Sequence, residues 1–307
     1  MKKLIQQILP SGKRVLCAFG SSDKGSFRDE NQDNFLILQP EDGRSYAYSL
    51  MEEEFQRLEG NWPETHIRVA VADGMGGHEG GREISQAAVT ELMNIDPQLT
   101  PEAMRFAILE LHKLLQSQFS SKGERNPGTT LVMADVEVKS GKGIMLNIGD
   151  SRALFLQKNQ WRQLTLDHHA FEFSWRDGEF DRDTYEAKLE AGDHRIVQAL
   201  GYGSMGIIRN EEGYKPFRFD PNIRLDLKAD LPPDLSDNTD VFTFHLSHGD
   251  MLMLASDGLW RADPEASWRD IPPEQLFSQD GVDKLVHSSA VRPEADDNIT
   301  VILCGFM

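Results

Sequence analysis

Five aspartates border apolar runs of the kind that form β-strands. Each run is rich in Val, Ile, Leu or Phe, and the pairs are Asp33 with 35–38, Asp73 with 67–72, Asp150 with 144–148, Asp257 with 251–255 and Asp297 with 299–303. A single Asp at a strand end is commonly a turn former, but a layered sheet brings several strand ends to one rim. Carboxylates crowded there repel one another unless cations balance them, and hard oxygen ligands select Mg²⁺ or Mn²⁺. The pattern therefore predicts a metal centre.

Arg28 precedes the first of these acids by five residues. Its planar guanidinium suits a phosphoryl group, which it can hold through two hydrogen bonds. In a site with two divalent ions, the metals lower the pKa of a bridging water, orient the ester and neutralise charge on the transferring group. No nucleophilic side chain is then required. The combination points to the hydrolysis of phosphate esters.

Two helices are expected among these strands. One carries an apolar face at helical spacing formed by Ile84, Ala87, Ala88 and Leu92. The other has Thr100 as N-cap, Pro101 as first helical residue and a buried stripe of Met104, Ile108, Leu111 and Leu115. Helices followed by runs of strands favour an α+β layered fold over regular βαβ repetition.

Two segments interrupt this pattern within what we expect to be a single domain spanning 1–307. Residues 40–64 are polar and predict a surface insertion with one short helix near 49–58. Residues 168–240 are rich in charge, Gly and Pro, and the strand pattern resumes at Val241. We therefore interpret 168–240 as an embedded subdomain.

The composition limits the kinds of partner. The 307 residues include 50 Asp and Glu against 32 Lys and Arg, a formal net charge of −18, which repels nucleic acids and anionic membrane surfaces. Cys17 and Cys304 lie far apart in apolar stretches and indicate reduced thiols. The first residues do not resemble a signal peptide, and no stretch is long and apolar enough to cross a membrane. We expect a cytoplasmic protein.

Six short motifs occur in a fixed order along the chain: Gly25-Ser-Phe-Arg28-Asp-Glu-Asn31-Gln-Asp33, Val71-Ala-Asp73-Gly-Met-Gly-Gly77, Gly128-Thr-Thr130, Gly149-Asp150-Ser-Arg152, Ser256-Asp257-Gly258 and Asp297-Asn298. Each one alone is weak. Together they resemble the PPM (PP2C-type) metal-dependent protein serine/threonine phosphatases in their bacterial form, and they span the chain from about Arg14 to its end.

This resemblance implies a four-layer α-β-β-α sandwich with two central antiparallel sheets and a flap at 168–240. It also implies the following site: Asp33, Asp73, Asp257, Asp297 and the backbone carbonyl of Gly74 as ligands of two Mn²⁺ or Mg²⁺ ions, Asp150 at a weaker third ion, and Arg28 on the substrate phosphate. A water or hydroxide bridging the two ions would attack phosphoserine or phosphothreonine in a protein, without a covalent phosphoenzyme. The implied partners are phosphoproteins made by an opposing serine/threonine kinase. The sequence does not determine the oligomeric state, for which a monomer is the expectation.

Some positions depart from the family pattern. Gln32 stands where many members have Glu, and Met75 stands where eukaryotic members have a His proposed as general acid. His78 is more simply explained by exposure on a Gly-rich turn. We interpret His168 and His169 as solvent-exposed loop residues rather than ligands. Trp161, Trp175 and Trp260 are expected to pack in or around the core.

Three other functions compete with a protein phosphatase. Residues 76–83 lie between a strand and a helix, as in a nucleotide-binding P-loop, but Arg82 and Glu83 replace the required Lys and Ser or Thr. A catalytically silent regulatory module would keep the fold, although every expected acid is present. A phosphatase of a small phosphorylated metabolite fits the same residues. Mn²⁺-dependent turnover separates an enzyme from a binding module.

Overall fold

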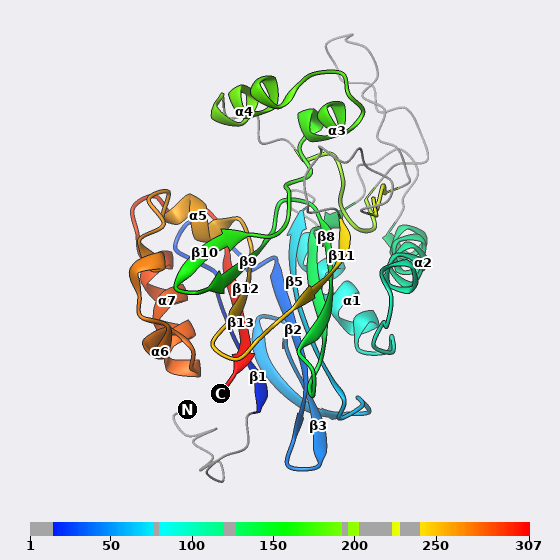
Figure 1. Ribbon diagram of the computed structural model, residues 1–307, viewed down its shortest axis with the longest axis vertical. Coiled ribbons are helices and arrows are strands. Elements are labelled where there is room, and N and C mark those ends of the chain that lie inside the picture. Colours follow the sequence, from blue (N-terminus) through cyan, green and yellow to red (C-terminus); the bar gives the residue numbers. More distant parts are fainter. Residues whose placement is uncertain (1–14, 76–79, 120–126, 192–195, 203–222, 228–239) are drawn as a thin grey trace.

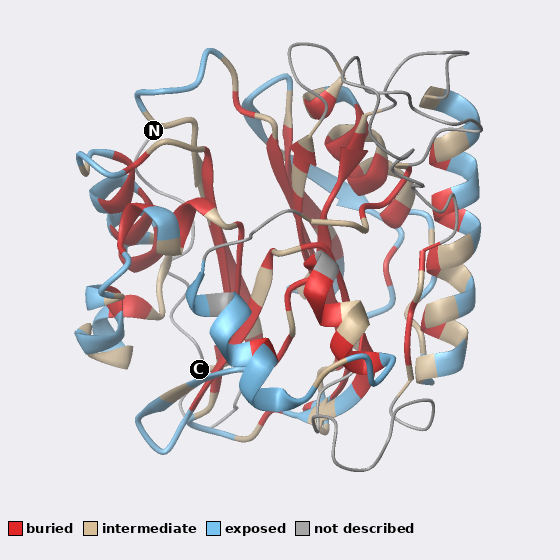
Figure 2. Ribbon diagram, turned by 90° about the horizontal axis from the view of Figure 1, so that it is seen from above, coloured by how far each residue is buried: buried red, intermediate tan, exposed pale blue. Residues whose placement is uncertain are grey.

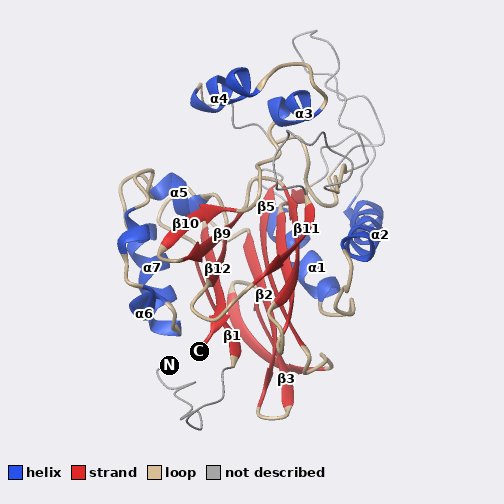
Figure 3. Cartoon of the chain, viewed as in Figure 1, coloured by secondary structure: helices blue, strands red, loops and turns tan. Residues whose placement is uncertain are grey.

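The chain folds as two β-sheets packed face to face and covered by helices on both outer sides (Figures 1 and 3). This computed structural model describes residues 15–75, 80–119, 127–191, 196–202, 223–227 and 240–307. All strand pairs within the two sheets are antiparallel. The predicted four-layer α-β-β-α sandwich is confirmed.

The first sheet has five strands, and we call it the small sheet. In spatial order it contains β1 (Leu16–Asp23), β13 (Ile299–Phe306), β12 (Met251–Ala255), β9 (Arg152–Gln157) and β10 (Gln160–Gln163). The second, the large sheet, contains β11 (Val241–His245), β8 (Lys142–Ile148), β7 (Leu131–Glu137), β5 (His66–Met75), β2 (Asp33–Glu41), β3 (Arg44–Met51) and β4 (Glu54–Gly60), with the short β6 (Gly128–Thr129) beside β5.

Helices lie on the outer face of each sheet. The large sheet is covered by α1 (Gly81–Leu92) and α2 (Pro101–Phe119), and the small sheet by α5 (Gly258–Ala262), the 3₁₀ helix η2 (Ser267–Asp270), α6 (Pro273–Leu276) and α7 (Gln279–Ala290). Two further helices, α3 (Ala170–Arg176) and α4 (Arg182–Glu190), stand off one end of the sandwich (Figure 1). Among the described residues, no helix combines the length and apolarity needed to cross a membrane.

The central strands are mainly apolar because both of their faces are covered, whereas the edge strands β4 and β10 are polar and mostly exposed. In β2, Leu36 packs toward α1 and α2, whereas its neighbour Phe35 packs between the sheets. In β12, Leu252 faces the large sheet and Met253 faces α7. Successive side chains of a strand point to opposite faces, so a strand buried on both sides needs apolar residues at every position. Figure 2 shows the buried strands at the centre of the molecule.

Both predicted helices are present with the expected buried faces. Thr100 caps α2, since its Oγ1 accepts a hydrogen bond from the Ala103 backbone nitrogen at 3.1 Å. The predicted stripe on α2, Met104, Ile108, Leu111 and Leu115, is buried. On α1, Ile84, Ala88 and Leu92 are buried and Ala87 is partly buried against the same cluster.

The helix expected near 49–58 is wrong, because this segment forms β3, β4 and the turn between them. Met51 pairs with Glu54 across a two-residue turn in which Glu52 and Glu53 both have positive φ, 52° and 64°. Such turns normally carry Asn or Gly, whose absence here concealed the hairpin. The segment 40–64 thus extends the large sheet beyond β2. A single domain spanning 1–307 stays a prediction.

A buried charge joins α1 to the large sheet. Arg68 on β5 is fully buried, and its Nε and Nη2 each donate to Asp135 on β7 at 2.7 Å. Its Nη1 also donates to the carbonyls of Leu92 and Ile95, at 2.7 Å each. Arg68 therefore satisfies the last carbonyl of α1 and a carbonyl just beyond it, and fixes the helix end on the sheet.

We expect Arg68→Met to lower the free energy of unfolding by about 3–5 kcal/mol, because the Asp135 carboxylate would remain buried without its cation. Urea unfolding followed by far-UV circular dichroism measures this difference. The matched control is Arg44→Met, which breaks the exposed pair between Arg44 and Glu59. Comparable destabilisation by the two substitutions would contradict this role of Arg68.

Candidate functional site

The predicted acids of the large sheet lie opposite each other. Asp33 is the first residue of β2 and Asp73 lies near the end of β5, and the antiparallel register pairs them directly. Asp33 is buried. Because β2 starts where β5 ends, the two carboxylates share one end of the sheet.

The predicted acids of the small sheet come to the same end of the sandwich. Asp257 follows β12 and Asp297 precedes β13, and these strands are paired neighbours. Asp150 lies in the connection from β8 in the large sheet to β9 in the small sheet. We call the set Asp33, Asp73, Asp150, Asp257 and Asp297 the acidic rim.

The acids of the rim act on one another electrostatically. Burial raises the pKa of Asp33 to about 7, and the negative charges of Asp297 and Asp257 add to the rise. Burial followed by the charge of Asp33 raises the pKa of Asp73 well above its ordinary value. The pKa values of Asp150 and Asp257 are also raised, first by burial and then by another rim acid. The rim therefore holds more negative charge than its surroundings balance.

This donor set fits divalent cations by charge and by chemistry. Its carboxylate oxygens are hard ligands of the kind that Mg²⁺ and Mn²⁺ select. The Oδ1 atom of Asp257 is buried and makes no hydrogen bond with the described residues. In the described part of the chain, no three His, Cys, Asp or Glu side chains are grouped so that they could hold a metal ion as they stand.

Ser256 orients the buried acid from the opposite sheet. Its Oγ donates to Asp33 Oδ2 at 2.7 Å and accepts from the Thr300 backbone nitrogen at 2.9 Å. These contacts connect β12 and β13 of the small sheet to β2 of the large sheet. The motif Ser256-Asp257-Gly258 contained this signal, although the sequence did not show which acid Ser256 would reach.

Asn298 fixes the loop that carries Arg28. Its side-chain amide donates to the carbonyls of Lys24 and Glu30, at 2.9 and 3.1 Å, and its Oδ1 accepts from the Gln32 nitrogen at 2.9 Å. Arg28 is half-exposed, and its Nη2 lies 2.7 Å from Asp297 Oδ2. The predicted phosphate-binding residue therefore lies at the open edge of the acidic rim.

Gly74 follows Asp73 where two backbones approach closely. A Cβ atom at Gly74 would lie 2.1 Å from the Gly81 carbonyl oxygen, so only glycine fits. Thr130 accepts from the Asp73 nitrogen through Oγ1 at 3.0 Å, and its own nitrogen donates to the Asp73 carbonyl at 2.8 Å. These contacts explain the motif Gly128-Thr-Thr130. Met75 ends β5, and His78 lies outside the described residues.

The interpretation of His168 and His169 as exposed loop residues is wrong, because both are buried. The Gly149 nitrogen donates to His168 Nδ1 at 3.1 Å. His168 Nε2 must then carry the proton and donate to Asp240 Oδ1, 2.8 Å away. Both ring nitrogens are engaged, so His168 is not available as a metal ligand.

The same network extends into the flap. Arg176 on α3 donates through Nη1 to Asp240 at 2.8 Å and to Asp226 at 3.2 Å, and through Nε to Glu172 at 2.8 Å. His168 thus links the start of the flap to the loop that carries Asp150. No local signal predicted this, since Asp240 lies 72 residues from His168.

The tryptophans pack as expected. Trp175 is buried and stacks on Tyr185 of α4, with ring centroids 4.4 Å apart. Trp161 meets Trp268 edge to face at 5.5 Å. Trp260 lies under the Arg152 guanidinium, 4.2 Å from its ring centroid. All three serve packing.

Arg261 is a charged residue of the rim that the sequence interpretation missed. Its Nη1 lies 3.2 Å from Asp257 Oδ2 and 3.1 Å from Asp297 Oδ2, and its Nη2 lies 2.5 Å from Asp296 Oδ2. Arg261 follows Asp257 by one helical turn of α5, a spacing at which opposite charges meet. That spacing was visible in the sequence.

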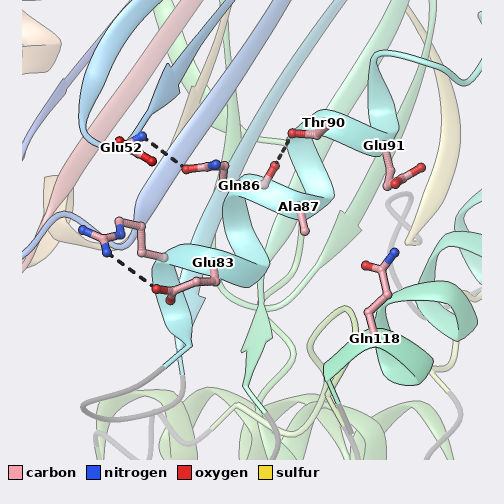
Figure 4. A pocket seen from close by; sticks show the side chains of 8 residues that line it. Glu52, Glu83, Gln86, Ala87, Thr90, Glu91 and Gln118 are labelled. Atoms are coloured by element: carbon pink, nitrogen blue, oxygen red, sulfur yellow. Dashed lines mark hydrogen bonds and ion pairs between the residues drawn. The ribbon is translucent and has the colours of Figure 1, made fainter.

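A separate hollow of about 380 Å³ lies beside α1 and shares no residue with the acidic rim (Figure 4). Its lining side chains partly satisfy one another. Gln86 Oε1 accepts from the Glu52 nitrogen at 3.2 Å, and Arg82 pairs with Glu83 at 3.5 Å. The hollow holds no group poised for chemistry, so the candidate site is the rim.

Comparisons with known proteins found similar serine/threonine phosphatases. Residues 55–298 match the family model described as protein phosphatase 2C. The serine/threonine phosphatase stp of Listeria welshimeri is 28% identical over 291 residues, covering 92% of this chain and 92% of that protein.

Solved structures agree with the fold. The serine/threonine phosphatase of S. agalactiae matches with a TM-score of 0.64 and 21% identity, over 94% of this chain and 99% of that one. The catalytic domain of the serine/threonine protein phosphatase PstP, in complex with two manganese ions, matches with a TM-score of 0.54 and 19% identity, over 96% of this chain and 100% of that one.

The acidic rim should make the chelated protein less stable as the pH rises. The pKa of Asp33 moves from 3.8 to about 7 on folding, so the folded chain binds this proton more tightly than the unfolded chain. The resulting stabilisation is present below pH 3.8 and is lost as the pH rises through about 7. We expect the melting temperature of the wild type, measured in a chelator, to fall as the pH rises from about 3.8 to about 7. The melting temperature of Asp33→Asn should fall less over the same range. Thermal scans against pH measure the slopes.

The control for this measurement is Asp270→Asn, an exposed acid on η2. It should keep the wild-type slope. Identical slopes for Asp33→Asn and the wild type would show that burial and the neighbouring charges do not raise the pKa of Asp33.

Proposed function

Because the chain belongs to the protein phosphatase 2C family, we propose that it hydrolyses phosphoserine and phosphothreonine esters in proteins with the help of divalent metal ions. The observation that carries the proposal is the acidic rim, in which burial and then mutual negative charge raise the pKa values of carboxylates from both sheets beside Arg28. Relatives named serine/threonine phosphatase, such as the Listeria protein, support the substrate class.

In this proposal, Asp33, Asp73, Asp257, Asp297 and the Gly74 carbonyl hold two Mn²⁺ or Mg²⁺ ions, and Asp150 contributes to a weaker third. When bound, such ions activate water and neutralise charge on the phosphoryl group. The raised pKa values support this assignment, since a cation would relieve the repulsion that causes part of the shifts. The structural relative with two manganese ions supports the choice of metal.

Three other residues bind the substrate phosphate or position the groups of the site. Arg28 binds the phosphate at the open edge of the rim, and Asn298 holds the loop that presents it. Ser256 fixes the orientation of the Asp33 carboxylate. Met75 has no titratable proton, so the leaving-group proton comes from another group.

We propose direct hydrolysis without a covalent phosphoenzyme. Two hydroxyls next to rim acids in the sequence, Ser256 and Ser151, are buried and hydrogen-bonded: Ser256 donates to Asp33, and Ser151 bonds Thr130 at 2.6 Å. Both hydroxyls are fully buried, so neither is placed to attack a phosphoryl group held by the half-exposed Arg28. Water is therefore the proposed attacking group.

The remaining expectations are also proposals. A phosphoprotein substrate fits a half-exposed Arg28 at an open rim better than a small metabolite fits it, because small ligands are usually enclosed by a pocket. We further propose an opposing serine/threonine kinase and a monomeric protein. The two free cysteines, Cys17 and Cys304, support a cytoplasmic location.

We expect Asp73→Asn and Asp257→Asn each to lower Mn²⁺-dependent kcat/KM by more than about 100-fold, because a lost ligand exceeds the 10–100-fold effect typical of outer partners. The assay measures hydrolysis of a phosphothreonine peptide and of p-nitrophenyl phosphate by pure protein, with Mn²⁺ and with chelator. Circular dichroism checks that the fold persists. No Mn²⁺-dependent turnover by the wild type would instead favour a catalytically silent module.

Arg28→Ala should mainly raise KM for the phosphopeptide, by roughly tenfold, because it removes a charged hydrogen bond made in both ground and transition states. Steady-state kinetics separates KM from kcat. Arg28→Lys, which keeps the charge without the planar fork, should fall between wild type and Arg28→Ala. A fall in kcat at unchanged KM would refute phosphate binding by Arg28.

A further inference from the structure

One guanidinium contacts three carboxylates at the acidic rim. Arg261 reaches Asp257 and Asp297 through Nη1, at 3.2 and 3.1 Å, and Asp296 through Nη2 at 2.5 Å. Two of these partners are proposed metal ligands. Arg261 therefore lies where positive charge is needed when no metal ion supplies it.

The two carboxylate oxygens of Asp257 have different surroundings. Its Oδ2 is paired with Arg261, whereas its Oδ1 is buried without a hydrogen bond from the described residues. Asp297 Oδ2 pairs with both Arg261 and Arg28, at 3.1 and 2.7 Å. Arginine therefore pairs with two carboxylates that the proposed function assigns to the metal ions.

The position of Arg261 allows it to leave. Its side chain is 41% exposed, whereas those of Asp257 and Asp297 are 15% and 18% exposed. An ion pair so open to solvent is weak and is screened by salt, so release of the guanidinium into water is inexpensive. The acids are attached to the ends of β12 and β13, whereas the Arg261 side chain can move into solvent.

Resting on the proposed metal-dependent function, we propose that Arg261 is a resident counter-ion of Asp257 and Asp297 that a divalent ion must displace. Arg261 stabilises the metal-free rim and raises the metal concentration at which the rim fills. Metal loading then frees the guanidinium beside Arg28. The degree of metal occupancy at low metal concentration is set in part by this one side chain.

The test is direct Mn²⁺ binding, measured by isothermal titration calorimetry on pure, chelator-treated protein without substrate. We expect Arg261→Ala to bind Mn²⁺ about threefold to tenfold more tightly than the wild type, as expected for the loss of a competing exposed ion pair. Without metal, Arg261→Ala should melt at a lower temperature than the wild type, and Mn²⁺ should raise its melting temperature by more.

The matched control is Arg269→Ala, which removes the same charge from an exposed position on η2, eight residues along the chain. It should bind Mn²⁺ as the wild type does. Repeating the titration in about 0.5 M KCl should narrow the difference between Arg261→Ala and the wild type, because salt screens the exposed pairs.

The outcomes separate the two proposals. If the wild type binds Mn²⁺ and Arg261→Ala binds it equally or more weakly, Arg261 is only a structural ion-pair partner and the counter-ion proposal is overturned. Equal tightening in Arg269→Ala would also overturn it, by assigning the effect to net charge. If the wild type and all variants bind no Mn²⁺, the proposed metal centre itself fails.

Discussion

Repulsion among carboxylates at one end of a β-sandwich is the constraint on which the other features of this protein depend. The sheets bring Asp33, Asp73 and Asp257 together, and burial together with mutual charge raises their pKa values. Carboxylates kept at this end need cations or protons. The fold thus maintains an arrangement that is unfavourable by itself and becomes favourable when positive charge arrives.

The neighbours of the rim can be understood as responses to this constraint. Ser256 gives Asp33 a hydrogen bond from the opposite sheet, and Asn298 ties down the loop that brings Arg28 to Asp297. Arg261 supplies a further positive charge from α5. The strands behind them are packed on both faces, so the rim is built on rigid elements rather than on loops alone.

Among the described residues, a buried network connects α3 to the loop that carries Asp150. His168 accepts from the Gly149 nitrogen, next to Asp150, and donates to Asp240, which in turn binds Arg176 of α3. Every partner in this chain of contacts is buried, so a change at α3 reaches the Asp150 loop through few intermediates. These contacts give α3 a physical route to the Asp150 loop.

The sequence by itself determined the α+β class, the helices near 84–92 and 101–115, and the five strand-end acids, because these depend on local periodicity and on residues adjacent in the chain. It failed at 49–58, where Glu52 and Glu53 adopt positive φ without the usual Asn or Gly. Tertiary structure alone decided which acid Ser256 would reach and that His168 would be buried against Asp240. Both contacts join residues far apart in sequence, 223 and 72 positions, and only the packing of the two sheets and the flap brings them within hydrogen-bond distance.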